Sequence, residues 1–306
     1  MATNIRNNFP DFFGTTKLPQ LEAVILAKNE SYASMIPILF NEEMMTTDIY
    51  QTTTHSGLRN PTLKNENENV TFQSMRPGFS KTYTALEYAT GYRISRQMVR
   101  DGKFSFIERA TNSFAKGMFE IKEIKASGVF DDGFTVNGYD GVPLFSVSHP
   151  LENGEGTLGA NRPSAASELS VSSFRELRNV MQDTLNENGQ LVKYIPQTFV
   201  VPQALQDDAQ EILGSQFTPE NANNAINTVY QMCRVLPGGF WNYLSSDTAF
   251  FLVAGKEDHS LMFMNRNPLE VTTDYDTHAF AHEIIASIRF DQGYSSWRGV
   301  VGNPGA

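Results

Sequence analysis

Residues 140–164 read DGVPLFSVSHPLENGEGTLGANRPS. The stretch opens with a turn signal, Asp140-Gly141, followed by a short apolar strand candidate at Val142–Phe145. A long polar, glycine-rich loop then runs up to the start of the next predicted helix. Long loops without secondary structure are uncommon in compact domains, where they usually serve a function or join two units. We therefore expect a joint or a functional loop at this point of the chain.

The segment before this stretch predicts the clearest helix of the chain. Apolar residues recur every three or four positions over residues 105–128, which is typical of a helix with one buried face. The predicted buried stripe consists of Ile107, Ala110, Phe114, Met118, Ile121 and Ile124. Charged residues are expected on the opposite face: Glu108, Arg109, Lys116, Glu120, Lys122 and Glu123. Ser105 and Glu108 predict a capping box, Gly128 predicts the end, and the helix would be roughly 36 Å long. Asn137-Gly138 then indicates a hairpin.

The segment after the stretch, residues 165–268, predicts a separate α/β unit. Ser173 and Glu176 indicate a capping box at the start of a helix whose apolar residues face a core. The remaining predicted elements are a strand at Tyr194–Val201, a helix from Pro202 to Gly214, and a second strand at Ala249–Val253.

The first 94 residues predict two extended parts. Residues 1–45 are expected to form an arm with a short helix at Gln20–Met35. Residues 46–94 are polar in the middle and rich in Thr and Tyr at the flanks, which favours a long hairpin with little to bury against. Because such a hairpin cannot stabilise itself in isolation, we expect it to lie on a neighbouring subunit. A disordered surface loop is the alternative interpretation.

The chain ends with a return to β structure in residues 269–306. Alternate positions are apolar from Phe280 to Phe290, which is the period of a half-buried strand.

The composition excludes several classes of function. The 306-residue chain has 40% apolar residues, a mean hydropathy of −0.33 and a net charge of −10. No apolar run reaches the roughly 18 residues of a membrane span, and the first residues do not predict a signal peptide. Phosphate binding needs clustered Lys and Arg, so the acidic balance argues against a protein whose main task is to grip nucleic acid. The single cysteine, Cys233, excludes an internal disulfide and is expected to be a small buried apolar residue in a reducing cytoplasm.

A glycine motif within the opening stretch lacks the context of a nucleotide site. Gly154, Gly156 and Gly159 match G-x-G-x-x-G, which cradles a pyrophosphate only where a strand leads tightly into a helix. Residues 161–163, Asn-Arg-Pro, stand where that helix should already be running. We interpret the motif as part of a loop.

Two histidine patterns also fail as sites. His278 and His282 have the spacing of a shared metal on a helix, but position 279 is Ala and the segment alternates like a strand, which would place the imidazoles about 13 Å apart. Ser148-His149 lacks the strand–elbow–helix of a nucleophile, so His149 is expected to pack a loop or an interface. We predict no catalytic, cofactor-binding or metal-binding residues.

Four segments together carry a resemblance to a known family. PLFSVSHP at 143–150 and LSVSSFRELRNVMQD at 169–183 are followed by YIPQTFVVPQALQDDAQEIL at 194–213 and RFDQGYSSWRGVVGNPGA at 289–306. In this order and spacing they resemble the major head subunit of Mu-like tailed bacteriophages, a branch of the capsid proteins with the HK97-type fold. The resemblance covers the second half of the chain in detail and the first half in layout.

The resemblance implies an α+β, HK97-type capsid fold. Its expected parts are an N-terminal arm (1–45), an extended β-hairpin loop (46–94), a peripheral domain with the spine helix (95–150), an axial α/β domain (151–268) and C-terminal strands that return to the peripheral domain (269–306). Trp297, Arg298 and Gly299 match the family's closing motif and are expected to pack the last strand.

The implied function is a major capsid protein that assembles into an icosahedral shell around the double-stranded DNA of a tailed phage or prophage. Its expected partners are copies of itself in pentamers and hexamers, a scaffolding protein, a portal and decoration proteins, with no membrane and no sequence-specific binding of DNA. We expect it in the virion after assembly in the host bacterial cytoplasm. Arg59, Lys64 and Arg76 are the predicted inter-subunit contacts. The alternatives are a tail tube or neck protein, or a metal-dependent hydrolase that uses His278 and His282.

Overall fold

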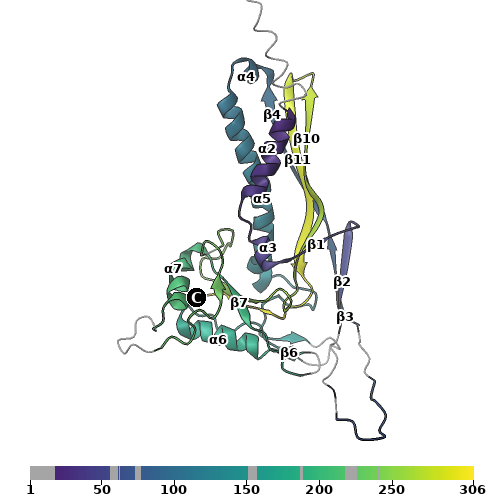
Figure 1. Cartoon of the computed structure of the whole chain (residues 1–306), viewed down its shortest axis with the longest axis vertical. Coiled ribbons are helices and arrows are strands. Elements are labelled where there is room, and N and C mark those ends of the chain that lie inside the picture. Colours follow the sequence, from purple (N-terminus) through teal and green to yellow (C-terminus); the bar gives the residue numbers. More distant parts are fainter. Residues whose placement is uncertain are drawn as a thin grey trace, which may run out of the picture.

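The computed structural model describes residues 18–55, 61, 63–72, 77–150, 157–186, 189–217, 226–239 and 241–306. Figure 1 shows a tall upper part, in which a long helix lies along a long sheet, and a broader lower part that carries α6, α7 and β7. A hairpin projects from the base of the long sheet on the side away from α7.

The long sheet holds four strands in the order β1-β10-β11-β4. They are β1 (Asn41–Met44), β10 (Leu261–Asp276), β11 (Ala281–Tyr294) and β4 (Leu86–Ser95). β1 runs parallel to β10, and the other neighbours are antiparallel. The predicted alternation holds along β11, where Ile284, Ala286, Ile288 and Phe290 are buried. Phe280 does not belong to this strand: it lies in the turn before β11 with a φ of 48° and an exposed ring.

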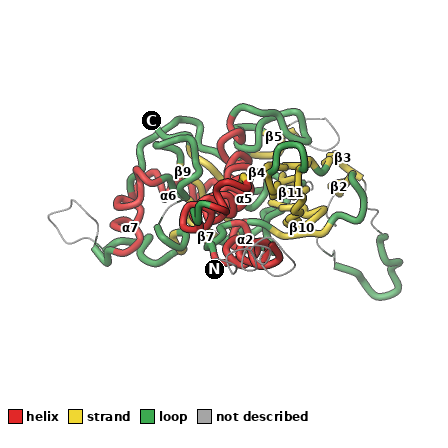
Figure 2. The backbone as a smooth tube through the Cα atoms, turned by 90° about the horizontal axis from the view of Figure 1, so that it is seen from above, coloured by secondary structure: helices red, strands yellow, loops and turns green. Residues whose placement is uncertain are grey.

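The spine helix α5 (Phe104–Asp131) lies against one face of this sheet, with the N-terminal helix α2 (Leu18–Ser31) on the same side (Figure 2). Its buried face consists of Ile107, Thr111, Ala115, Met118, Phe119, Glu123, Ala126, Ser127 and Phe130. The predicted stripe was therefore rotated: Ile124 is exposed and the carboxylate of Glu123 is buried. The reason is that α5 meets α2 and the lower unit as well as the sheet.

The predicted ends of the spine helix were wrong. Ser105 lies inside the helix, and the N-cap residue, Lys103, makes no capping hydrogen bond with its side chain. Gly128 also lies inside the helix, which continues to Asp131 because the next turn places Phe130 in the core.

The N-terminal segment is broken where a single helix at Gln20–Met35 was predicted. α2 ends at Ser31, and α3 (Ile36–Leu39) starts after a short non-helical stretch. Ser34 and the backbone of Met35 bind the carboxylate of Glu123 in this stretch, which explains the interruption. A further short helix, α4 (Arg96–Arg100), is capped by the Ser95 side chain and leads from β4 towards α5.

The predicted hairpin is formed by β2 (Ile49–His55) and β3 (Pro77–Thr84), which pair antiparallel. β3 continues into β4 of the long sheet after Ala85. The expected 94/95 boundary therefore falls inside β4, and the expected 268/269 boundary falls inside β10.

The lower unit contains a second sheet with the order β12-β9-β7-β8. Its strands are β7 (Pro196–Val200), β8 (Arg234–Val235), β9 (Phe250–Ala254) and β12 (Val300–Asn303). Helices α6 (Val171–Gln182) and α7 (Gln206–Gly214) bury Phe174, Leu177 and Ile212 against it. The short elements are the 3-10 helices η1 (Asp132–Phe134) and η2 (Gln203–Leu205) and the two-stranded pair of β5 (His149–Pro150) with β6 (Thr157–Gly159). Ser170, and not Ser173, is the N-cap of α6, and the two serines form the capping box together.

Among the described residues, none of the helices combines the length and the apolar character that crossing a membrane requires.

The turn between β9 and β10 contains a histidine, His259, at the entrance to β10. His259 is buried, and its Nδ1 accepts a hydrogen bond from the backbone N–H of Leu261 at 3.2 Å. Nδ1 must therefore be unprotonated. Burial, and secondarily the charge of Lys256, lowers the pKa of His259 to about 4.

This burial predicts a loss of stability on acidification. An unfolded histidine has a pKa of about 6.5, so between that pH and the folded pKa of about 4 the unfolded chain binds more protons. The stabilisation is complete above pH 6.5 and is lost as the pH falls through 4, by as much as roughly 3 kcal/mol. Urea unfolding at pH 7 and pH 4.5 measures it. The matched control is His259→Asn, whose Oδ1 can accept the same N–H and does not titrate; an unchanged pH dependence in this variant would contradict the assignment.

Candidate functional site

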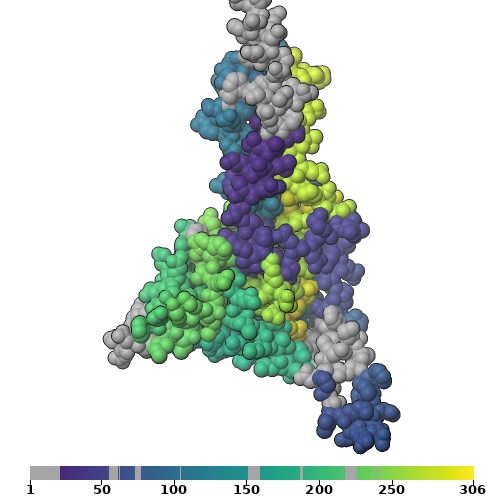
Figure 3. Space-filling model, viewed as in Figure 1, coloured from purple at the N-terminus to yellow at the C-terminus, as the bar shows by residue number. Residues whose placement is uncertain are grey.

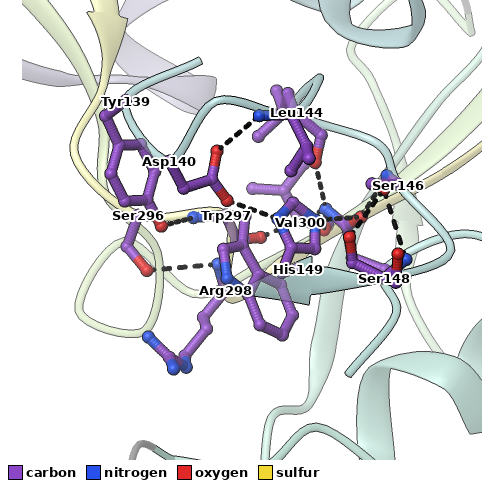
Figure 4. Close-up of polar contacts among 12 residues, drawn as sticks. Tyr139, Asp140, Leu144, Ser146, Ser148, His149, Ser296, Trp297, Arg298 and Val300 are labelled. Atoms are coloured by element: carbon purple, nitrogen blue, oxygen red, sulfur yellow. Dashed lines mark hydrogen bonds and ion pairs between the residues drawn. The ribbon is translucent and has the colours of Figure 1, made fainter. Parts of the chain in front are cut away.

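The described parts of the opening stretch, residues 140–150 and 157–164, surround a buried polar network (Figure 4). His149 on β5 has no exposed surface, and its ring stacks on the indole of Trp297 with centroids 4.3 Å apart and an interplanar angle of 8°. Its Nδ1 lies 2.7 Å from Oδ2 of Asp140, and its Nε2 lies 3.0 Å from Oδ1 of Asn161. We call these four residues, Asp140, His149, Asn161 and Trp297, the joint network.

The amide of Asn161 has its orientation fixed by the backbone. Its Nδ2 donates to the carbonyl of Leu144 at 2.6 Å and to the carbonyl of Val300 at 3.1 Å. Its Oδ1 accepts from the backbone N–H of Ser146 at 2.8 Å. Because the amide nitrogen faces carbonyls, the oxygen must be the atom that faces His149. Nε2 of His149 is therefore a donor.

The protonation of the pair follows from the same count of donors and acceptors. Nδ1 of His149 faces a carboxylate oxygen, and Nε2 faces an amide oxygen. A neutral imidazole has one N–H only, so either the ring carries two protons or Asp140 holds one. With side-chain exposures of 1% and 2%, the two groups are buried together, and the cost of taking them out of water is offset by the hydrogen bonds that they make. Both ring nitrogens are engaged, so neither can activate the hydroxyl of Ser148.

The joint network lies where the chain passes from the long sheet into the lower sheet. Trp297 belongs to the short link between β11 and β12, and its backbone N–H donates to the hydroxyl of Tyr139 at 3.3 Å. Burial raises the pKa of Tyr139, which keeps this hydroxyl neutral. Gly299 has a φ of +77°, and a Cβ there would meet the carbonyl oxygen of Asp258 at 2.3 Å, so the link requires glycine at this position. The network therefore fixes how the two sheets meet.

The two histidines of the alternative metal site are not brought together. His278 is exposed in the β10–β11 turn, while His282 lies on β11 with its ring 4.7 Å from that of Tyr275. Within the described ranges, no group of three or more His, Cys, Asp or Glu side chains is placed to hold a metal ion. Gly154 and Gly156 fall outside the described residues. Burial raises the pKa of Cys233 to about 12, so this thiol packs and does not react.

Two of the three predicted inter-subunit residues, Arg59 and Arg76, also lie outside the described residues. Lys64 is described and exposed near the hairpin tip. The buried roles of Asp140, Asn161 and Glu123 were missed, and only the unusual length of the 146–164 loop indicated that this region had a special role.

Removing the imidazole should destabilise the fold far more than removing the carboxylate charge. His149→Ala leaves Asp140 buried without its partner, which costs about 3–5 kcal/mol. Asp140→Asn should cost only about 1 kcal/mol, because the new amide N–H can donate to Nδ1 of a neutral ring that still donates to Asn161. Chemical unfolding measures both, with Val147→Ala, at an exposed position of the same loop, as the control. Equal losses for the two variants would rule out this account of the network.

The comparisons with known proteins agree with this architecture. Residues 79–303, most of the chain, match the profile of a family described as phage capsid protein. No curated protein matches the chain in sequence.

Solved capsids share the fold at low sequence identity. The capsid of bacteriophage JBD30, decorated with minor capsid protein trimers, has a TM-score of 0.54 and 15% identity, covering 70% of this chain and 92% of that one. A virus-like particle from Pyrococcus furiosus has a TM-score of 0.56 and 8% identity, covering 93% and 98% of the two chains. The structure from Microbacterium phage Oxtober96 has a TM-score of 0.56 and 10% identity, covering 89% and 91%. These likenesses show the fold, and the family profile supplies the assignment. The chain therefore belongs to the phage capsid protein family, has the HK97-type fold and is a shell-forming capsid protein.

Proposed function

We propose that this capsid protein is the major head subunit of a tailed phage or prophage, and that its copies form rings of five and six that close into an icosahedral shell around double-stranded DNA. The observation that carries the proposal is the β2–β3 hairpin. Its described tip, residues 61 and 63–72, is exposed at every position and stands clear of the body (Figure 3). An arm built in this way has its binding partner outside its own subunit.

The root of the hairpin is firmly anchored. The hydroxyl of Tyr83 donates to the carbonyl of Tyr294 and accepts from its N–H, so one side chain satisfies both backbone groups. The backbone N–H of Thr84 donates to the carboxylate of Asp291 at 3.0 Å, beside this contact. An arm that reaches a neighbouring subunit at a defined angle needs a fixed root and an exposed tip, and this hairpin has both.

The tip has the chemistry of a contact surface. Leu63 and Phe72 are 89% and 93% exposed, and Val70 is 61% exposed, within an otherwise polar segment. Large apolar side chains exposed on one projecting tip favour a surface for binding another protein. In a closed ring each subunit offers one surface to a different surface of the next, so we infer that the tip binds a second copy. Arg59, Lys64 and Arg76 are the proposed cationic contacts, which suits a partner chain with a net charge of −10.

The proposal extends to the setting of the shell. We infer that the protein acts without catalysis, is placed in the virion after assembly in the host bacterial cytoplasm, and works with a scaffolding protein, a portal and decoration proteins. The same acidic balance supports enclosure of DNA without sequence-specific binding, since tight binding would need clustered cations. We propose that the subunit has five parts: an arm (1–45), a hairpin (46–94), a peripheral domain (95–150), an axial domain (151–268) and the returning strands (269–306).

Electron microscopy of the purified full chain, alone and with a scaffolding protein, tests the proposal. Closed shells with five-fold vertices support it. A chain that stays strictly monomeric at high concentration under both conditions contradicts it, and tubes of uniform width would instead favour a tail protein.

Replacing the apolar tip residues should abolish shells and leave the fold intact. The variant Leu63→Ser, Val70→Ser, Phe72→Ser removes almost no buried area within the subunit, so its unfolding free energy should stay within about 1 kcal/mol of the parent. Its yield of shells, measured by sedimentation, should fall at least about tenfold, because the weakened contact recurs at every subunit of a closed shell. The matched control is Val136→Ser with Val147→Ser, exposed positions on the body. Parental shell yield in the tip variant, or loss of cooperative unfolding, would show that the tip has a different role.

A further inference from the structure

A buried carboxylate in the spine helix joins three parts of the subunit. Glu123 is 1% exposed and lies in the last third of α5. Its Oε1 accepts from the hydroxyl of Ser34 at 2.5 Å and from the backbone N–H of Met35 at 3.2 Å. Its Oε2 accepts from Nε1 of Trp241 at 3.1 Å. Ser34 and Met35 belong to the N-terminal segment, and Trp241 belongs to the lower unit.

The two sides of this contact have no direct hydrogen bond to each other in the described residues. The N-terminal segment continues from Met35 into α3, whose Leu39 and Phe40 are fully buried. Trp241 is 2% exposed and packs edge-on against Phe130 at 5.7 Å. Phe40 also packs edge-on against Phe130, at 6.2 Å, so the two sides share this apolar contact, and the Glu123 carboxylate is the polar link between them.

The energetics make this link cooperative. A buried carboxylate is costly unless its oxygens are satisfied. Burial raises the pKa of Glu123, and the bonds from Ser34, Trp241 and Met35, together with the charge of Lys122, oppose that rise. Loss of the donor on one side leaves the carboxylate less well satisfied and more costly to keep buried. The position that suits the donors on the other side then becomes less favourable as well.

We propose that Glu123 is a coupling residue: through its carboxylate, loosening the Trp241 loop loosens the N-terminal segment, residues 34–40, and loosening that segment loosens the loop. Such a coupling is reciprocal by linkage. Its consequence for assembly rests on the proposed function: a partner that displaces the N-terminal segment in the shell would alter the lower unit of the same subunit.

Hydrogen exchange on the purified, unassembled full chain tests the coupling in both directions. Trp241→Phe keeps an aromatic ring against Phe130 and removes only the N–H donor. It should speed exchange of the Ile38, Leu39 and Phe40 amides, which bond to the Met35 and Ile36 carbonyls, by about five- to tenfold. Ser34→Ala should speed exchange of the Trp241 amide, which bonds to the carbonyl of Val201 at 2.9 Å, by a similar factor.

A matched control separates coupling from general loosening. Ser127, one turn along α5, donates to the carbonyl of Tyr243 at 2.8 Å and so holds the same loop through a hydrogen bond that does not involve the Glu123 carboxylate. Ser127→Ala should speed exchange in residues 241–244 and leave residues 34–40 at the parental rate. In the Glu123→Leu background, Trp241→Phe should no longer affect residues 34–40; if that background does not fold, the three single variants decide alone. The proposal is overturned if Trp241→Phe changes exchange only in its own loop, or if Ser127→Ala affects residues 34–40 as strongly. Both readouts are made before assembly, so a failure to form shells leaves the test intact.

Discussion

The arrangement of the whole subunit depends on the buried contact between His149 and Asp140 against the indole of Trp297. At this point β11 of the long sheet must pass into β12 of the lower sheet within a few residues. The link has little backbone pairing of its own, so its carbonyls are bound by Asn161 and its direction is set by the stacked histidine. Apolar side chains could fill the same volume, but they could not donate hydrogen bonds to the carbonyls of Leu144 and Val300. Polar chemistry is buried here because the backbone itself needs partners.

Glu123 applies the same physical solution in a second place. It lies in the mostly apolar buried face of α5, and its four hydrogen bonds come from segments that are distant in sequence. The two sites differ in what they hold. The joint network fixes two sheets relative to each other, whereas Glu123 holds the stretch between α2 and α3 and the Trp241 loop against α5. Burial raises the pKa of Glu123 in the absence of a directly bonded cation, so its ionised form relies on neutral donors.

Local periodicity in the sequence predicted the helices and strands but not which distant residues pack against them. The alternation from His282 to Phe290 gave a strand, and the spacing of apolar residues gave the spine helix, because both patterns arise from burial on one side. The pattern failed at Glu123, which was assigned to the exposed face because a helical wheel treats every charge as solvated. Its donors, Ser34 and Trp241, are distant in sequence and have no shared period with it. The joint network was hidden for the same reason: Asp140, His149, Asn161 and Trp297 are united only by the fold. Resemblance to a family supplied the type of fold, and two of the boundaries expected between its parts, 94/95 and 268/269, lie inside the strands β4 and β10.

The clamp at the root of the hairpin has a mechanical consequence. Tyr83 grips the backbone of Tyr294, the ring of Tyr294 meets that of Tyr139 at 6.0 Å, and the hydroxyl of Tyr139 receives the N–H of Trp297. Three tyrosines thus connect the root of the hairpin to the indole on which His149 stacks. The hairpin is attached at the end of β11, so a force on its tip would act on the junction of the two sheets. Tension across a shell of such subunits would pass along the strands of the hairpin to this row of aromatic rings, and the rings would transmit it to the junction of the two sheets.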